Sequence, residues 1–131
     1  MTETILLIDD DEYIAGSLRR YLTGESWDVD VALDPPSAQA LMGSKRYGVV
    51  MVDPYLTGAV HREDGVLLRS ICQLQPAASL IVLTAYGSPE LAELAQTCRV
   101  VALLRKPQSV VALGQIITAA AKSRGEQNAH V

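Results

Sequence analysis

The sequence is poor in cysteine and has no long hydrophobic run. Its two cysteines, Cys72 and Cys98, lie 26 residues apart and form neither a CxxC motif nor a Cys/His ligand pattern. Residues 1–4 carry no basic charge, so we expect no secretory signal, and two isolated thiols then indicate a reducing cytoplasm. The longest apolar runs, Val49–Val52 and residues 100–104, are far shorter than a membrane span, so no membrane association is expected.

Basic residues are not in excess either, since 15 acidic side chains face 11 basic ones and the formal net charge is −4. The basic residues are scattered, which argues against direct nucleic-acid binding by this chain. Neither a P-loop nor a GxGxxG motif is present, so no ATP site is expected. The 131 residues suit one domain, which we place at residues 1–124, followed by a disordered polar tail at residues 125–131.

Short apolar runs alternate with longer segments of helical period. Four runs lack polar alternation, which is typical of parallel strands covered on both faces: residues 5–8, Val49–Val52, 80–83 and 100–104. Residues 27–33 alternate and predict a half-exposed edge strand. Helices are predicted at residues 14–24 with Gly24 as C-cap, 35–43, 67–74, 89–98 with Ser88 as N-cap, and 109–120. Five β-α units with short connections predict an α/β protein with an open, doubly wound parallel sheet.

Polar residues end the apolar runs. Asp9-Asp10, Asp53, Thr84 and Lys106 follow four different strands, and the carboxyl ends of parallel strands form one edge of the sheet, where ligands bind. Three carboxylates at one edge repel one another and need cations, of which Lys106 supplies one charge. Carboxylate oxygens with waters suit Mg²⁺. The same residues taken singly also fit structural roles, because acidic residues at strand ends often cap helices and Asp53-Pro54 is an ordinary turn start.

In this order and spacing the motifs resemble the response-regulator receiver domain of two-component signalling. The resemblance runs from about residue 4 to residue 124 and rests on four segments: ILLIDDDE at residues 5–12, VVMVD at 49–53, IVLTA at 81–85 and LRKP at 104–107. It implies a five-stranded flavodoxin-like sheet in the order 2-1-3-4-5 with five helices.

The resemblance also implies a role for each site residue. Asp53 would be the phosphoacceptor, Asp9 and Asp10 would hold Mg²⁺ together with Asp53, and the main-chain carbonyl of Tyr55 would be a further metal ligand. Thr84 would donate its hydroxyl to the phosphoryl group, and Lys106 would pair with that group. The phosphoryl donor would be a phosphohistidine on a sensor histidine kinase or a histidine phosphotransfer protein, and the output would be altered binding of an unidentified downstream protein.

The sequence departs from the usual receiver pattern at positions outside the predicted phosphorylation site. These departures concern how phosphorylation would change the surface that partners bind. Thr57 stands where a proline is common, Pro54 follows the acceptor directly, and the loop at residues 55–64 is about four residues longer than usual. Leu103 replaces the usual aromatic switch residue. Leu103, Thr57 and the long loop favour a second interpretation, a receiver-like docking module that binds partners without phosphorylation. A third, a small Mg²⁺-dependent phosphatase, would need a carboxylate at position 55, where a tyrosine stands.

Overall fold

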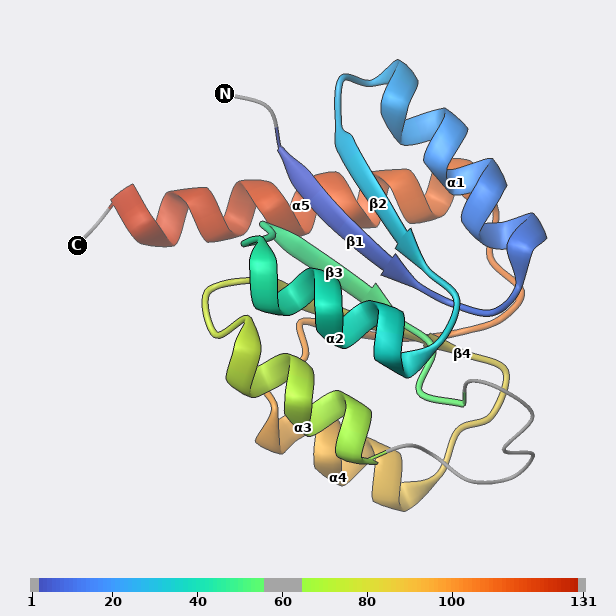
Figure 1. Cartoon of the computed structure of the whole chain (residues 1–131), viewed down its shortest axis with the longest axis vertical. Coiled ribbons are helices and arrows are strands. Elements are labelled where there is room, and N and C mark those ends of the chain that lie inside the picture. The colour runs from blue at the N-terminus through green and yellow to red at the C-terminus, as the bar shows by residue number, and fades with distance from the viewer. Residues whose placement is uncertain (1–2, 56–64, 130–131) are drawn as a thin grey trace.

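Strands and helices alternate along the chain (Figure 1). The structure is a computed structural model that describes residues 3–55 and 65–129. The elements in chain order are β1 Thr4–Ile8, α1 Glu12–Gly24, β2 Asp28–Ala32, α2 Pro35–Ser44, β3 Val49–Val52, α3 Gly65–Leu74, β4 Ser79–Thr84, α4 Pro89–Thr97, β5 Ala102–Arg105 and α5 Val110–Ala129. Thr57 and most of the long loop predicted at residues 55–64 lie outside the described residues.

The five strands form one parallel sheet in the order β2-β1-β3-β4-β5. The doubly wound, flavodoxin-like order expected from the sequence is therefore confirmed. In register, Ile8 lies beside Val52 and Val52 beside Val82. The carboxyl ends of β1, β3 and β4 consequently lie next to one another at the centre of one sheet edge.

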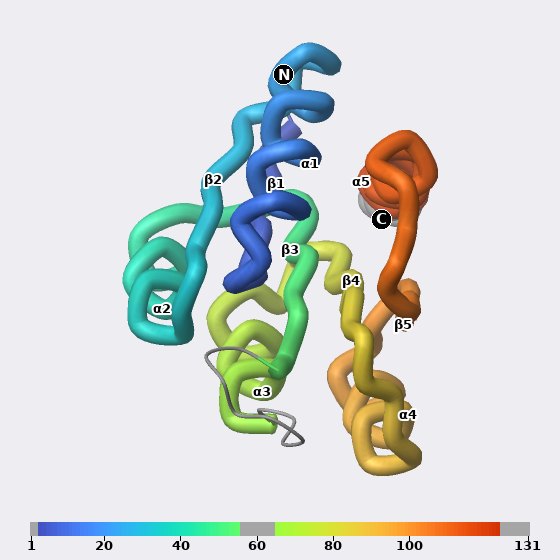
Figure 2. Tube along the Cα trace, turned by 90° about the vertical axis from the view of Figure 1, so that its right-hand side faces the viewer, coloured from blue at the N-terminus to red at the C-terminus, as the bar shows by residue number. Residues whose placement is uncertain are grey.

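Helices cover both faces of the sheet, with α1 and α5 on one face and α2, α3 and α4 on the other (Figure 2). Successive strand residues point to opposite faces, so β1 sends Ile5 and Leu7 toward α1 and α5 and sends Leu6 and Ile8 toward the other layer. The unbroken apolar runs of β1, β3 and β4 are almost entirely buried, as the sequence predicts. These three strands form the base of the edge at which the polar residues gather.

The two outer strands differ from the three central ones. β2 is an edge strand, as expected, but the prediction that residues 100–104 are covered on both faces is wrong. Among the described residues β5 pairs only with β4, and within it Ala102 and Leu104 pack on the cluster beneath α5. Leu103 points the other way and is 42% exposed, and Val101, just before β5, is 58% exposed. The apolar run at residues 100–104 therefore predicts a strand correctly, but it does not predict that the strand lies at the edge of the sheet.

Side-chain caps begin four of the helices in the part of the chain that the structure describes. Asp11, Asp34, Ser88 and Ser109 accept hydrogen bonds from backbone N–H groups of the first turns of α1, α2, α4 and α5, which confirms Ser88. Gly24 is not the C-cap of α1. The helix ends in a Schellman turn with Ser26 in the left-handed region (φ 70°), where Trp27 N–H donates to the Leu22 carbonyl at 2.9 Å. The turn falls there because it brings the indole of Trp27, 8% exposed, into the core.

Helices α1 and α5 approach closely where Tyr21 lies over Gly114. A Cβ at Gly114 would overlap the Tyr21 ring, with Cδ1 at 3.0 Å and Cζ at 3.1 Å. We expect Gly114→Ala to lower the free energy of unfolding by about 1–2 kcal/mol, because overpacking outweighs the gain in helix propensity. Gly16→Ala is the control, since its nearest neighbour is 3.9 Å away; it should stabilise the domain by up to about 1 kcal/mol. Equal stability changes in urea unfolding of the two variants would contradict this packing account.

A polar cluster joins β2 to the start of β3. Tyr47 Oη donates to Asp30 Oδ2 at 2.7 Å, and Lys45 Nζ contacts Asp28 and Asp30 at 2.9 and 3.0 Å. Gln75, which directly follows α3, anchors the same segment by donating to the carbonyls of Met42 and Lys45. Burial, and then the hydrogen bond to Asp30, raises the pKa of Tyr47 well above its ordinary value.

This raised pKa makes the fold sensitive to alkali. Near pH 10 Tyr47 loses its proton in the unfolded chain but keeps it in the folded chain. The contribution of Tyr47 to the free energy of unfolding is therefore fully present below about pH 10. Above that pH it declines by at most about 1.4 kcal/mol per pH unit. We expect Tyr47→Phe to lose less stability than the wild type between about pH 9 and pH 11 in urea unfolding. Tyr13→Phe is the control because Tyr13 is 80% exposed. Equal pH slopes in the wild type and Tyr47→Phe would exclude this role.

Helix α5 continues to Ala129, beyond the residue 124 at which the sequence suggests that the domain ends. The helix therefore covers much of the segment expected to be a tail, and the boundary stays a prediction. Among the described residues, none of the helices combines the length and the apolar character that crossing a membrane requires.

Candidate functional site

The polar residues of the candidate site lie at the carboxyl ends of four strands. Asp9 follows β1, Asp53 follows β3, Thr84 is the last residue of β4, and Lys106 follows β5. Asp9 and Asp53 are each 6% exposed, and Thr84 is fully buried. The sequence folds in this way because each apolar run ends at a polar residue, and parallel pairing brings those ends to the same edge.

The ammonium of Lys106 joins the two buried carboxylates. Its Nζ lies 2.9 Å from Asp9 Oδ2 and 2.9 Å from Asp53 Oδ2. The second oxygen of each carboxylate accepts a backbone N–H, from Asp11 to Asp9 Oδ1 at 2.9 Å and from Tyr55 to Asp53 Oδ1 at 3.0 Å. Both carboxylates are therefore held in defined orientations beside one positive charge.

Burial and charge act against each other in this cluster. Burial raises the pKa of Asp9, the Asp11 N–H and Lys106 lower it, and the negative charge of Asp53 raises it again, so that the pKa lies above the ordinary aspartate value. Burial lowers the pKa of Lys106, but its bonds to Asp53 and Asp9 outweigh burial and leave the pKa raised. The ionised form of Asp9 is thus costly here, and an additional cation would stabilise it.

The hydroxyl of Thr84 is engaged with the loop that follows β4. It accepts the N–H of Tyr86 at 3.1 Å and donates to the carbonyl of Tyr86 at 3.3 Å. Thr84 is thus brought to the site edge by the end of β4, while its proton is directed toward its own loop. Any new acceptor for that proton would have to compete with the Tyr86 carbonyl.

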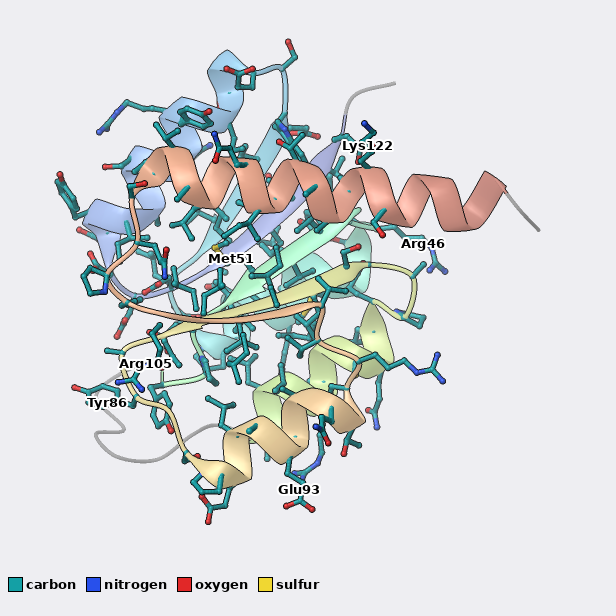
Figure 3. The ribbon with its side chains drawn as sticks, turned by 180° about the vertical axis from the view of Figure 1, so that it is seen from behind. Arg46, Met51, Tyr86, Glu93, Arg105 and Lys122 are labelled. Carbon is teal, nitrogen blue, oxygen red and sulfur yellow. The ribbon has the colours of Figure 1, made fainter. Side chains whose placement is uncertain are left out.

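Two tyrosines from neighbouring loops meet beside these residues. The rings of Tyr55 and Tyr86 pack edge to face, with centroids 5.3 Å apart and an interplanar angle of 64°. Tyr86 and Arg105 lie close together at the same end of the molecule (Figure 3). The Arg105 guanidinium lies 3.3 Å from the position that a Cβ on Gly87 would take. The sequence does not indicate this contact, because nothing in the LRKP motif shows where the side chain before Lys106 points.

The residues predicted to bind metal are only partly brought together. Asp9 and Asp53 share Lys106, Tyr55 touches Asp53 through its backbone N–H, and Asp10 follows Asp9 as an exposed residue. In the part of the chain that the structure describes, no three His, Cys, Asp or Glu side chains form a metal-binding group by themselves.

The chemistry of these donors nevertheless fits a hard divalent cation. All are oxygens, and three carboxylates (Asp9, Asp10 and Asp53) against one ammonium leave two negative charges in excess at this edge. The pKa of Asp9 is raised chiefly by burial, with a smaller contribution from the negative charge of Asp53.

Comparison with known proteins agrees with the fold. Residues 5–118 match the family model of the response regulator receiver domain, a range that includes Asp9, Asp53, Thr84 and Lys106. A CheY-like response regulator receiver domain protein from Methanospirillum hungatei JF-1 superposes with a TM-score of 0.88 at 23% identity, over 97% of this chain and 99% of that one.

Two further relatives are similar in sequence. A response regulator protein from Burkholderia pseudomallei, solved with a phosphorylated aspartic acid, a calcium ion and citrate, is 30% identical with a TM-score of 0.76, over 95% of this chain and 72% of that one. Protein PetR of Rhodobacter capsulatus is 29% identical over 83 residues, which are 63% of this chain and 33% of PetR. The chain thus matches only a third of the length of that curated relative. On the family match and this shared architecture, the chain belongs to the response regulator receiver domain family, whose members are signalling modules.

Proposed function

We propose that this domain receives a phosphoryl group on Asp53 from a phosphohistidine of a sensor histidine kinase or a histidine phosphotransfer protein. The observation that carries the proposal is the buried Asp53 carboxylate, held 2.9 Å from the Lys106 ammonium at the edge where four strand ends meet. The Burkholderia relative with its phosphorylated aspartic acid supports it.

The chain's own residues suit this transfer. A bond forms between an Asp53 carboxylate oxygen and phosphorus, the phosphorus–nitrogen bond to histidine breaks, and the imidazole leaves. Both reactants are anionic, so Lys106 lowers the barrier by offsetting their repulsion and stabilising charge on the phosphoryl oxygens. No general base is required, because a carboxylate nucleophile has no proton to lose.

A magnesium ion would complete the site. Asp9, Asp10, Asp53 and the main-chain carbonyl of Tyr55 are the residues that would hold it, and when bound it supplies positive charge beside the transferred group. Asp9 also keeps Lys106 in place by accepting its second ion pair. In this arrangement Lys106 is fixed before the phosphoryl group arrives.

Phosphorylation would switch the domain through Thr84. A phosphoryl oxygen competes for the Thr84 hydroxyl, which then gives up its bond to the Tyr86 carbonyl and frees the loop that leads into α4. The shift between two conformations would change the binding of a downstream protein. Leu103 has no aromatic ring to carry that signal, so the Tyr86 loop is the expected route.

Incubation with acetyl phosphate and Mg²⁺ tests the proposal. We expect the intact mass to rise by about 80 Da, the mass of one phosphoryl group, and the increase to disappear with EDTA or in Asp53→Asn. Asp34→Asn is the matched control, because Asp34 is a half-buried aspartate that caps α2 by accepting the Ser37 N–H, a bond that asparagine can keep. Labelling of Asp53→Asn to the wild-type level would refute the assignment of the acceptor.

A receiver-like docking module is the second candidate. It is favoured by the exposure of Leu103, which presents an apolar side chain where the family usually has an aromatic switch residue. The same experiment separates the two functions, since a constitutive docking module stays unphosphorylated and binds its partner equally well with and without phosphodonor.

A further inference from the structure

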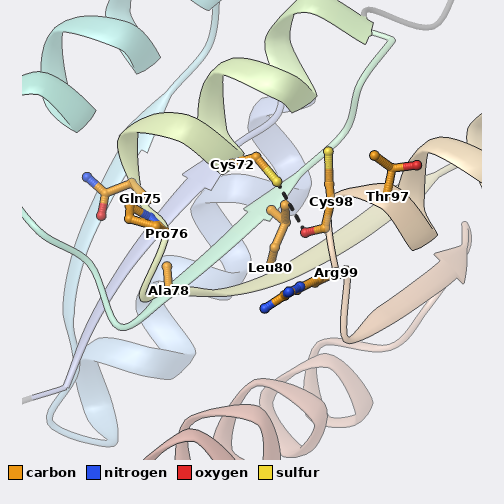
Figure 4. A pocket seen from close by; sticks show the side chains of 8 residues that line it. All are labelled: Cys72, Gln75, Pro76, Ala78, Leu80, Thr97, Cys98 and Arg99. Atoms are coloured by element: carbon orange, nitrogen blue, oxygen red, sulfur yellow. Dashed lines mark hydrogen bonds between the residues drawn. The ribbon is translucent and has the colours of Figure 1, made fainter.

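Two cysteines from different helices meet at the edge of the sheet opposite Asp53. Cys72 lies near the end of α3, and Cys98 is the C-cap of α4. The thiol of Cys72 donates to the main-chain carbonyl of Cys98 at 3.2 Å (Figure 4). Residues 26 positions apart in the chain are thereby placed side by side by the packing of α3 and α4 against the sheet.

The two cysteines share the wall of a cavity of about 250 Å³. Leu80 from β4 lies behind them, and Thr97 and Arg99 flank Cys98 (Figure 4). Cys98 is 7% exposed and Cys72 is half-buried. A small reagent in this cavity can therefore reach Cys72, whereas Cys98 is shielded from bulk solvent.

We propose that Cys72 and Cys98 form a dithiol site that a low-molecular-weight disulfide oxidises to an intramolecular disulfide, which joins the C-terminal ends of α3 and α4. This proposal is independent of phosphorylation at Asp53, because it concerns the other edge of the sheet.

The reaction balances as two exchanges. The Cys72 thiolate attacks one sulfur of the reagent disulfide, which forms a mixed disulfide and releases one small thiolate. Cys98 then attacks the Cys72 sulfur of that mixed disulfide and releases the second small thiolate. The two protein thiols lose two electrons to the reagent, and their two protons end on the two released thiols.

The pKa of Cys72 controls the rate at which the two cysteines are oxidised. Burial and the neighbouring Cys98 raise the pKa of Cys72 to about 11, against the opposing charge of Arg99. Cys72 is mostly protonated at neutral pH, and its thiolate fraction grows about tenfold per pH unit below that pKa. The oxidation should therefore be slow near pH 7 and faster in mild alkali.

The test uses the whole chain with bis(2-hydroxyethyl) disulfide at about pH 8.5, followed by intact mass measurement without reductant. We expect the wild type to lose about 2 Da, whereas Cys98→Ser should instead gain one adduct of about 76 Da, because its mixed disulfide cannot be resolved. Treatment with dithiothreitol should restore the starting mass in both proteins.

Thermal unfolding gives a second readout. Closing a loop of 26 residues restricts the unfolded chain, so the oxidised protein should melt up to about 10 °C above the reduced one. An unchanged mass, stable adducts on the wild type or a disulfide-linked dimer would each overturn the proposal, since each shows that the two sulfurs do not join within one chain.

Discussion

Replacing Asp10 with alanine is expected to weaken Mg²⁺ binding by about 100-fold or more while leaving the fold intact. The two buried carboxylates already bind Lys106, so the exposed Asp10 is the carboxylate of the set that faces solvent. Removing one charge about 4 Å from a cation costs about 4 kcal/mol at an effective dielectric of 20, and about 2.7 kcal/mol already corresponds to a 100-fold change in Kd. Isothermal titration calorimetry measures the loss directly.

Glu12→Gln provides the matched control for Asp10→Ala. Glu12 is an exposed acid at the start of α1, and its replacement removes the same charge two residues further along the chain. Its Mg²⁺ affinity should stay within about twofold of the wild type, because exposed charges beyond the site are screened by solvent and salt. If Asp10→Ala and the wild type bound Mg²⁺ equally well, the assignment of Asp10 as a ligand would be wrong.

Replacing Tyr55 and Tyr86 together with serine is expected to shorten the lifetime of phosphorylated Asp53 by about 10- to 100-fold. Hydrolysis needs a water in line with the acyl phosphate, and we expect the residues two after Asp53 and two after Thr84 to lie beside the approach of that water. Here those residues are two tyrosines in ring contact, 5.3 Å between centroids, each with its backbone N–H on the site, Tyr55 on Asp53 and Tyr86 on Thr84. Displacing or misplacing the water can cost about 100-fold, or about 2.7 kcal/mol of barrier.

The lifetime is measured by intact mass after rapid removal of the phosphodonor at saturating Mg²⁺. The matched control is the double replacement by phenylalanine, which keeps both rings and removes both hydroxyls, and its lifetime should equal that of the wild type. If a tyrosine hydroxyl instead positioned the water, phosphorylated Asp53 would have a longer lifetime in the phenylalanine variant than in the wild type. An unchanged or longer lifetime in the serine variant would count against shielding by the rings.

Much of the site can be located from the sequence alone, because it depends on local patterns. Asp9, Asp53 and Thr84 stand directly at the end of an apolar run, and Lys106 stands one residue beyond another. Parallel pairing then places all four at one edge. Their roles in phosphoryl transfer and Mg²⁺ binding stay predictions, which phosphorylation and calorimetry test. The helix start at Ser88-Pro89 is equally local, since an N-cap and a proline at the first turn need only their own helix.

Local patterns fail where a neighbour distant in the chain decides the outcome. Gly24 has the residue type of a helix terminator, yet the burial of Trp27 moves the left-handed turn to Ser26. The apolar run at residues 100–104 has the composition of a central strand, yet β5 has a strand neighbour on one side only, so Leu103 faces solvent. In both cases the residue type alone does not reveal what packs against it.

The sequence by itself determined the class of fold, the strand ends and the residue types that meet at the site, because periodicity and strand termination are properties of short segments. The tertiary structure decided which side chains touch: Lys106 bridging two carboxylates, the ring contact of Tyr55 with Tyr86, and Cys72 beside Cys98. These contacts join segments brought together by strand order and helix packing. Such long-range pairings depend on the shape and burial of the whole core, which local patterns do not contain.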